Sequence, residues 1–224
     1  MAFAFSDPLY PIADAAGGRD VVTLAEAILA GGATLLQLRA KEVPTADLVA
    51  LARAIKARTD AAGARLIVND RADVARLVHA VGVHLGQDDL PPAAARAILG
   101  PGAVIGCSTH NLDQVAGALR DGAIDYLAFG PIYPTASKRV ADPAQGLAAL
   151  RDARARCALP LVAIGGIDAS TVADVLAAGA DAVAVIGAVA GAADPAAALR
   201  ALRDAGRRGA SHVALTTRRS RPRS

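Results

Sequence analysis

The chain has 224 residues, of which 54% are hydrophobic and 20% are charged. This length and composition fit a single globular domain with a full apolar core and exclude a chain that is disordered throughout. The net charge of +3 is unevenly distributed, because every acidic residue precedes a set of six closing arginines. These are Arg207, Arg208, Arg218, Arg219, Arg221 and Arg223. We predict a basic, flexible tail over residues 211–224 and no nucleic-acid partner.

Targeting signals and cysteines bear on where the chain works. No apolar run reaches the ~18 residues of a membrane span, and the opening MAFAFSDPLYP lacks a basic segment followed by an apolar one. The two cysteines, Cys107 and Cys157, lie far apart without the spacing of a zinc site or a disulfide framework. We expect a cytoplasmic protein with no membrane partner.

Short apolar segments typical of buried strands recur along the chain and alternate with segments of helical spacing. The predicted strands cover residues 9–13, 34–39, 65–69, 82–86, 103–108, 125–130, 160–166 and 181–187. The predicted helices cover residues 20–30, 45–62, 71–79, 91–99, 111–120, 143–157, 169–178 and 194–207. Thr45 is the predicted N-cap of the second helix, and glycines follow several of the others.

Eight alternating strand and helix pairs predict an α/β fold, a (β/α)8 TIM barrel, as one catalytic domain over residues 1–210. The alternative is a doubly wound sheet. A dinucleotide site in such a sheet needs G-x-G-x-x-G after the first strand, and ADAAGGRD does not supply it. In a TIM barrel the active site lies at the carboxyl ends of the strands, so the residues that end each strand are the candidates.

The second predicted strand ends in alternating polar residues, Gln37, Arg39 and Lys41. Alternate residues of a strand share a face, so one amide and two cations point the same way. They could bind a phosphorylated substrate. The alternative is that the two cations form buried ion pairs with carboxylates of the barrel.

Two carboxylates, Asp70 and Asp89, follow neighbouring predicted strands. Mg²⁺ is commonly held by one or two carboxylates together with phosphate oxygens, so this pair is a candidate magnesium site. The alternatives are that Asp70 caps the helix that begins near Arg71 and that Asp88 and Asp89 form an ordinary acidic loop.

Phosphate-binding features follow the last three strands. The segment PTASK ends with Thr135, Ala136, Ser137 and Lys138, which offer two hydroxyls and an ammonium. Glycines at Gly165-Gly166 and the Ile186-Gly187 pair fit the phosphate site that TIM barrels place after strands seven and eight. Plain tight turns are the alternative for the glycines, and an exposed loop is the alternative for PTASK.

Three further residues are candidates for chemistry or for the core. His84 is interpreted as structural or as a support for residues that contact the ligand, and Cys107 as a small core residue. His110 lies close to Ser108 in the chain and is a candidate for proton transfer, with a structural role as the alternative.

The predicted anion sites differ in character. Strands two to four offer cations and metal-binding carboxylates, which suit a diphosphate, whereas strands seven and eight offer neutral backbone, which suits a monophosphate. Two phosphorylated partners at one barrel mouth indicate a transferase with diphosphate as the leaving group.

The motifs QLRAK, IVND, GVHLGQDD, IGCSTHN, FGPIYPTASK, AIGGI and GADAVAVIGAV resemble the thiamine-phosphate synthase family in order and over residues 9–205. The resemblance implies a transferase that joins 4-amino-2-methyl-5-(diphosphooxymethyl)pyrimidine to a thiazole phosphate. The products would be thiamine monophosphate and diphosphate. It implies Mg²⁺ as cofactor and departure of diphosphate before the thiazole nitrogen attacks.

The resemblance also implies a role for each matching residue. It places Gln37, Arg39, Lys41, Asn69, Ser108 and Lys138 on the pyrimidine diphosphate, with Arg39, Lys41, Ser108 and Lys138 as catalytic residues. It places Thr135, Ala136, Ser137, Gly166, Ile186 and Gly187 on the thiazole phosphate. It assigns Asp70 and Asp89 to Mg²⁺. Ser137 stands where threonine is common, and the hydroxyl is kept. Gly187 stands where serine is common, so the side-chain contact with the phosphate would be lost at that position.

Two other functions are alternatives. A thiazole tautomerase, an isomerase on the same barrel, resembles the chain at the paired glycines and at His110. It typically lacks the Asn-Asp and Gln-x-Asp segments. A non-catalytic barrel that binds a phosphorylated ligand is disfavoured by the intact cation and metal positions. Small phosphorylated substrates are the expected partners, and the sequence leaves a homo-oligomer open.

Overall fold

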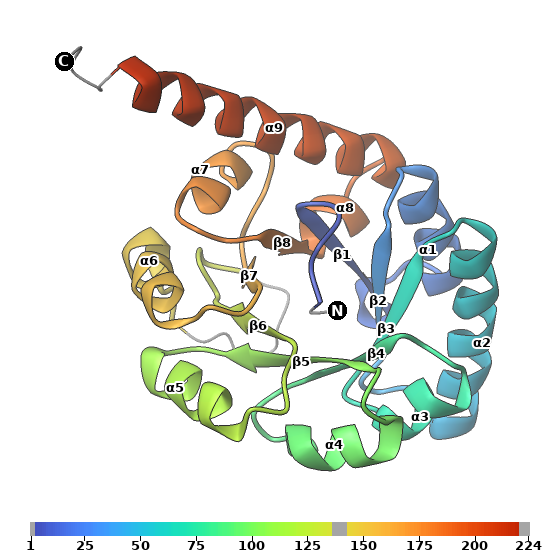
Figure 1. The fold of residues 1–224 in the computed structure, drawn as a ribbon. Helices are drawn as coiled ribbons and strands as arrows, with labels where there is room; N and C mark the ends of the chain where they lie inside the picture. The colour runs from blue at the N-terminus through green and yellow to red at the C-terminus, as the bar shows by residue number, and fades with distance from the viewer. Residues whose placement is uncertain (1–2, 136–142, 220–224) are drawn as a thin grey trace.

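The computed structural model describes residues 3–135 and 143–219, and of residues 209–219 the backbone alone. Within these ranges eight parallel strands close into a barrel in chain order (Figure 1). The strands are β1 Leu9–Asp14, β2 Leu35–Arg39, β3 Arg65–Asn69, β4 Gly82–Leu85, β5 Val104–Thr109, β6 Tyr126–Phe129, β7 Leu161–Ile164 and β8 Ala182–Val185. The first and last strands pair, with Leu9 opposite Val183, so the predicted TIM barrel is confirmed and the doubly wound sheet is wrong.

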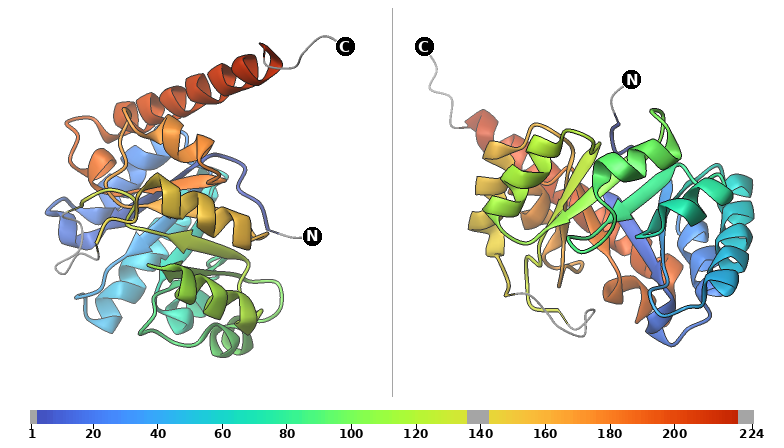
Figure 2. Two further views of the ribbon diagram at one scale, coloured as in Figure 1. Left: turned by 90° about the vertical axis from the view of Figure 1, so that its left-hand side faces the viewer. Right: turned by 90° about the horizontal axis from the view of Figure 1, so that it is seen from below.

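The helices surround the barrel, as Figures 1 and 2 show. They are α1 Val21–Ala30, α2 Thr45–Ala61, α3 Ala72–Leu77, α4 Pro92–Leu99, α5 Leu112–Asp121, α6 Gly146–Arg156, α7 Val172–Ala177, α8 Gly187–Ala190 and α9 Pro195–Arg219, with a 3₁₀ turn at Ala15–Gly17. The short α8 was not predicted, and α9 extends past the predicted end at residue 207. The N-cap of α2 is Pro44, so the prediction of a Thr45 cap is wrong.

Alternation along the strands separates the outer layer from the lumen. In β2, Leu36 and Leu38 belong to the core cluster that packs under the helices, whereas Leu35 belongs to a second cluster that fills the lumen. Gln37 and Arg39 share the parity of Leu35 and therefore face inward. The polar end of this strand is thus directed into the barrel mouth.

The amino-terminal segment closes one end of the barrel. Phe5 packs edge-on against Tyr126, and Phe3 and Phe5 are in ring contact with each other. The N-terminus accordingly lies over the centre of the barrel in Figure 1. This end is opposite the carboxyl ends of the strands, because Tyr126 begins β6.

Helix α9 is anchored to the start of the fold. Arg203 donates from Nε to Asp7 and from its terminal nitrogens to the carbonyls of Gly31 and Gly32. The Arg203–Asp7 pair is largely buried, with both side chains 11% exposed. Among the described helices, none is both long and apolar enough to cross a membrane.

Candidate active site

Two adjacent pockets open at the carboxyl ends of the strands. One, of about 410 Å³, is lined by the polar residues that end β2, β3 and β4. The other, of about 320 Å³, lies beside the ends of β6, β7 and β8. Ser108, His110, Ile164 and Ile186 line both pockets and form a shared wall. We call them the polar pocket and the neutral pocket.

The predicted cations line the polar pocket, and each is paired with a carboxylate. Arg39 donates to Asp14, whose side chain is only 5% exposed. Lys41 is 48% exposed, and its Nζ lies 3.1 Å from Oδ2 of Asp70. The buried ion pair that was the alternative for these residues therefore exists for Arg39, whereas the Lys41 pair is half-exposed, and both pairs lie in the wall of the pocket itself.

The predicted metal ligands also line the polar pocket. Arg71, not Asp70, is the N-cap of α3, so the capping role considered for Asp70 is wrong. Burial raises the pKa of Asp70 to about 6, with a further contribution from the neighbouring Asp89 carboxyl and an opposing one from Lys41. Asp89 accepts a hydrogen bond from the Gly86 backbone at 2.6 Å.

The donor set of these carboxylates suits Mg²⁺. The described residues contain no cluster of three metal-ligating side chains of the His, Cys, Asp and Glu types. Two adjacent carboxylates remain, which is the number that Mg²⁺ commonly takes from a protein when phosphate oxygens and waters complete its shell. Burial is the main cause of the raised pKa of Asp70, and the Asp89 carboxyl adds to it, a like-charge contribution that a bound cation would offset.

Asn69 carries a buried donor that the protein leaves unused. Its Nδ2 has no hydrogen-bond partner within the described part of the chain, although Asn69 lines the polar pocket. Buried polar groups are nearly always hydrogen-bonded, so an orphaned donor in a pocket wall indicates a ligand acceptor. A phosphate oxygen would satisfy it.

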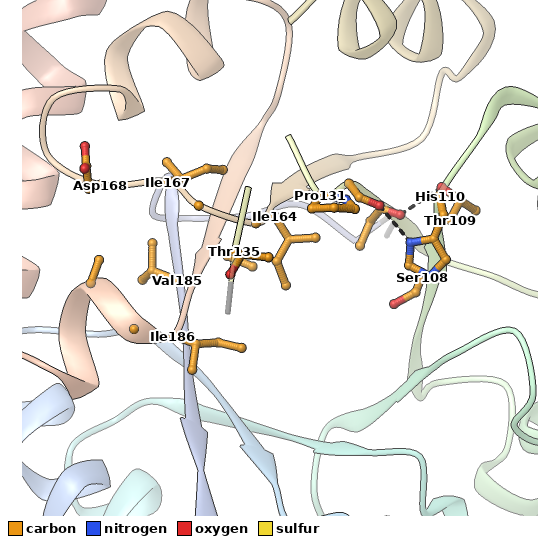
Figure 3. A pocket seen from close by; sticks show the side chains of 17 residues that line it. Ser108, Thr109, His110, Pro131, Thr135, Ile164, Ile167, Asp168, Val185 and Ile186 are labelled. Carbon is orange, nitrogen blue, oxygen red and sulfur yellow. Dashed lines mark hydrogen bonds between the residues drawn. The ribbon is translucent and has the colours of Figure 1, made fainter. Parts of the chain in front are cut away.

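The neutral pocket is built around close backbone contacts. Gly166 has φ +64, and a Cβ atom there would lie 2.5 Å from the Pro134 carbonyl oxygen. Gly165 is similarly crowded by Pro131. Thr135, Gly166, Ile186 and Gly187 line this pocket together, so the structure gathers the described part of the predicted thiazole-phosphate set. Figure 3 shows Thr135 near Ile164, with Ser108 and His110 at one end of the pocket and Asp168 at the other.

Comparison with known proteins supplies the family. The family model described as thiamine monophosphate synthase matches residues 9–189. The chain belongs to the thiamine monophosphate synthase family. Its relatives include thiamine-phosphate synthases of Moorella thermoacetica, 51% identical over 72% of this chain and 77% of the relative, and of Methanoculleus marisnigri, 52% identical over 72% and 76%.

A solved structure agrees with this membership. The thiamine phosphate pyrophosphorylase from Pyrococcus furiosus is 36% identical, has a TM-score of 0.81, and is matched over 90% of this chain and 96% of its own. The predicted family, the TIM barrel and the enzyme class, a transferase, are thus confirmed.

The structure describes only some of the other residues that the sequence singles out. Ala136, Ser137 and Lys138 lie outside the described residues. Cys107 is buried, and burial raises the pKa of its thiol to about 11, which fits the predicted core role. The His110 Nδ1 atom lies 2.7 Å from the Gly130 carbonyl oxygen, which orients the ring in the shared wall.

Sequence reasoning missed three residues of the synthase barrel. Asp14 pairs with Arg39, and the hydroxyls of Tyr10 and Tyr126 meet in the lumen at 3.0 Å. The alternation in LYPIAD was a usable signal, because it places Tyr10 and Asp14 on one face of the first strand, with Ile12 between them.

Proposed function

We propose that this chain is a Mg²⁺-dependent thiamine-phosphate synthase, joining the pyrimidine diphosphate to the thiazole phosphate to give thiamine monophosphate and diphosphate. The observation that carries the proposal is the pair of pockets of opposite character with a common wall. Two substrates held on either side of that wall would meet at Ser108 and His110. Family membership and the names of the relatives support the same reaction.

The polar pocket would hold the pyrimidine diphosphate. The unpartnered Nδ2 of Asn69 would donate to a phosphate oxygen, and Arg39 and Lys41 would offset the negative charge that grows as diphosphate departs. Lys41 is half-exposed, so it can turn from Asp70 toward the ligand. Lys138, which lies outside the described residues, is proposed for the same anion on the family pattern alone.

Asp70 and Asp89 would hold the Mg²⁺ ion. When bound, the ion neutralises charge on the leaving diphosphate. The two carboxylates would hold the ion in the wall of the polar pocket, and the backbone N–H of Gly86 orients Asp89 for this role. Lys41 also favours the ionised form of Asp70 that a metal requires.

The neutral pocket would hold the thiazole phosphate. Gly166 and Gly187 bring backbone close to the ligand, and Thr135 adds a hydroxyl. Ala136 and Ser137 are proposed to extend this site on the family pattern. Ile164 and Ile186 supply apolar surface for the ring on the wall that both pockets share.

We propose that diphosphate leaves before the carbon–nitrogen bond forms. The attacking thiazole nitrogen carries a lone pair and loses no proton, so the reaction requires no general base. Ser108 and His110 would then orient the two rings. Substitution at Ser108 should consequently lower kcat more than it changes the KM of the thiazole phosphate.

The test is to mix purified protein with both phosphorylated substrates, with and without Mg²⁺. We expect thiamine monophosphate and diphosphate in equal amounts, and only with the metal. No product from active substrates would refute the synthase, and product without any divalent cation would refute the metal site. Thiazole substrate alone tests the isomerase, which would change that substrate without the pyrimidine.

We further propose a cytoplasmic location, because Cys107 and Cys157 are both buried free thiols. Small phosphorylated molecules are the proposed partners, and a homo-oligomer stays a prediction that measurement of the molar mass in solution would test.

A further inference from the structure

A column of hydrogen-bonded side chains runs through the lumen from one wall of the polar pocket to the other. Gln37 donates from Nε2 to the Tyr10 hydroxyl at 2.9 Å, and Tyr10 and Tyr126 share a hydrogen bond of 3.0 Å. The Tyr126 hydroxyl lies 2.8 Å from Nδ1 of His84, and Nε2 of His84 lies 2.8 Å from Oγ of Ser108. The column thus joins residues of β2, β1, β6, β4 and β5.

The packing of the lumen is adapted to this column. A Cβ atom on Gly106 would lie 2.5 Å from Nδ1 of His84 and closer still to the Tyr126 ring, so only glycine leaves room for their hydrogen bond. The rings of His84 and Tyr126 are stacked, with centroids 5.5 Å apart. Tyr10 and Tyr126 are almost fully buried, so each hydroxyl depends on its neighbours in the column for hydrogen bonds.

The number of hydroxyl hydrogens in the column determines the direction in which its hydrogen bonds are donated. Burial raises the pKa of both tyrosines, so each keeps its hydroxyl hydrogen at neutral pH and can donate once. Because Tyr10 already accepts from Gln37, its own hydrogen goes to Tyr126. The hydrogen of Tyr126 is then directed to Nδ1 of His84, which must accept it.

We propose that Gln37, acting through Tyr10 and Tyr126, holds His84 as the neutral tautomer with its hydrogen on Nε2. That hydrogen is donated to Oγ of Ser108. The hydroxyl hydrogen of Ser108 is consequently directed away from His84, toward a hydrogen-bond acceptor of the ligand in the shared wall. Tyr10 and Tyr126 are positioning residues, because they act on the ligand only through His84 and Ser108.

Reversal of the Gln37 amide would reverse every hydrogen bond of the column. His84 would then carry its hydrogen on Nδ1, and Ser108 would donate to His84 and present only an acceptor to the ligand. The cations Arg39 and Lys41 line the same pocket as Gln37 and favour the amide oxygen on that side, which directs the amide nitrogen to Tyr10. The orientation of the Gln37 amide therefore determines whether Ser108 binds a hydrogen-bond acceptor or a hydrogen-bond donor of the ligand.

The tautomer of His84 is measurable by ¹⁵N NMR of the full-length, ligand-free protein labelled at histidine. The chain has four histidines, and a His84→Asn variant identifies the signals of His84. We expect an unprotonated Nδ1 and a protonated Nε2. A hydrogen on Nδ1, or an imidazolium with hydrogens on both nitrogens, would overturn the proposal.

Variants test the relay itself. Gln37 is hydrogen-bonded to Tyr10 and not to Tyr126 or His84, yet Gln37→Leu should give a mixture of both tautomers, as should Tyr126→Phe. Phe5→Leu is the control, because Phe5 packs against Tyr10 and Tyr126 without a hydrogen bond in the column. A single unchanged tautomer in folded Gln37→Leu would refute control by Gln37. The role of Ser108 toward substrate rests on the proposed function, but the tautomer is measured without turnover, so either proposal can fail alone.

Discussion

Nζ of Lys41 lies 3.1 Å from Oδ2 of Asp70, so a predicted phosphate-binding cation and a predicted metal ligand are direct neighbours. Lys41 lowers the pKa of Asp70, but burial and the Asp89 carboxyl outweigh it and leave that pKa near 6. In the proposed function, Asp70 takes up a divalent cation and Lys41 takes up an anion.

Asp89→Ala should lower kcat/KM by about 100-fold or more. Substitution of a residue that only supports a metal ligand already lowers metal affinity or activity by about 10–100-fold, and a ligand itself should matter more. Asp88→Ala is the matched control, because it removes the same charge from the next residue of the same pocket wall. Its effect should be far smaller. Steady-state rates at saturating Mg²⁺ check this, and equal losses in the two variants would argue against a metal at Asp89.

The Mg²⁺ requirement should depend on pH through Asp70. Its pKa of about 6 lies above the usual carboxyl value, so below pH 6 the metal must displace a proton. The Mg²⁺ concentration for half-maximal rate should then rise by up to about tenfold for each unit that the pH falls below 6. In Lys41→Met the pKa of Asp70 rises further, and the same increase should begin at a higher pH. A requirement that is constant from pH 5 to 8 would contradict this.

The same pKa has a consequence for stability. A carboxyl whose pKa is raised by folding favours the folded state at low pH, and this contribution is lost as the pH rises from about 3.8 through 6. Mg²⁺ removes the repulsion between the ionised carboxylates. The increase in Tm caused by Mg²⁺ should therefore be larger at pH 8 than at pH 5.

Arg39 and Lys41 should differ in their effect on stability although both line the polar pocket. Arg39→Met leaves Asp14 buried and unpaired and should lower the free energy of unfolding by about 3 kcal/mol. Lys41→Met breaks a half-exposed pair and should cost less than about 1 kcal/mol. Urea denaturation measures both, and addition of Asp14→Asn should restore part of the stability of Arg39→Met. Equal stabilities would show that the Arg39 pair does not support the fold.

Gly166→Ala should raise the KM of the thiazole phosphate about tenfold or more, because its Cβ would displace the Pro134 carbonyl next to Thr135. Gly63→Ala is a close control: Gly63 also has φ +64, but nothing lies within 4 Å of an added Cβ. Both variants should lose about 1–2 kcal/mol through the left-handed backbone. Only Gly166→Ala should change the KM, and a similar KM in the two variants would exclude this role for Gly166.

Gly187→Ser should lower the KM of the thiazole phosphate. Gly187 begins α8 and lines the neutral pocket, so a hydroxyl there would add a hydrogen bond to an anion. One such bond contributes about 1.5 kcal/mol, or roughly tenfold. The KM of the pyrimidine diphosphate is the internal control and should not change. An unchanged thiazole KM would place the phosphate away from the start of α8.

Much of the barrel and of its mouth could be predicted because strand geometry is local. Alternation puts Gln37 and Arg39 on the face opposite Leu36 and Leu38, and helical crossovers make successive strands parallel, so that their carboxyl ends lie at one edge. Gln37, Arg39, Lys41, Asn69, Asp70, Asp89 and Ser108 therefore gathered in one pocket as expected. The short α8 was not foreseen, since its four residues are too few to display helical periodicity.

The sequence by itself thus determined which residues end the strands, and through them the family and the location of the candidate site. Only the tertiary structure decided which side chains touch. Tyr10 and Tyr126 are separated by 116 positions, and Arg39 meets Asp14 across two strands. The Tyr10–Tyr126 contact depends on barrel closure and on the room that Gly106 leaves for Tyr126, whereas the Arg39–Asp14 contact depends on the register between β1 and β2. No local pattern in the chain encodes these features. The physical reason is that periodicity specifies the direction of a side chain, whereas its partner is specified by packing between strands far apart in the chain.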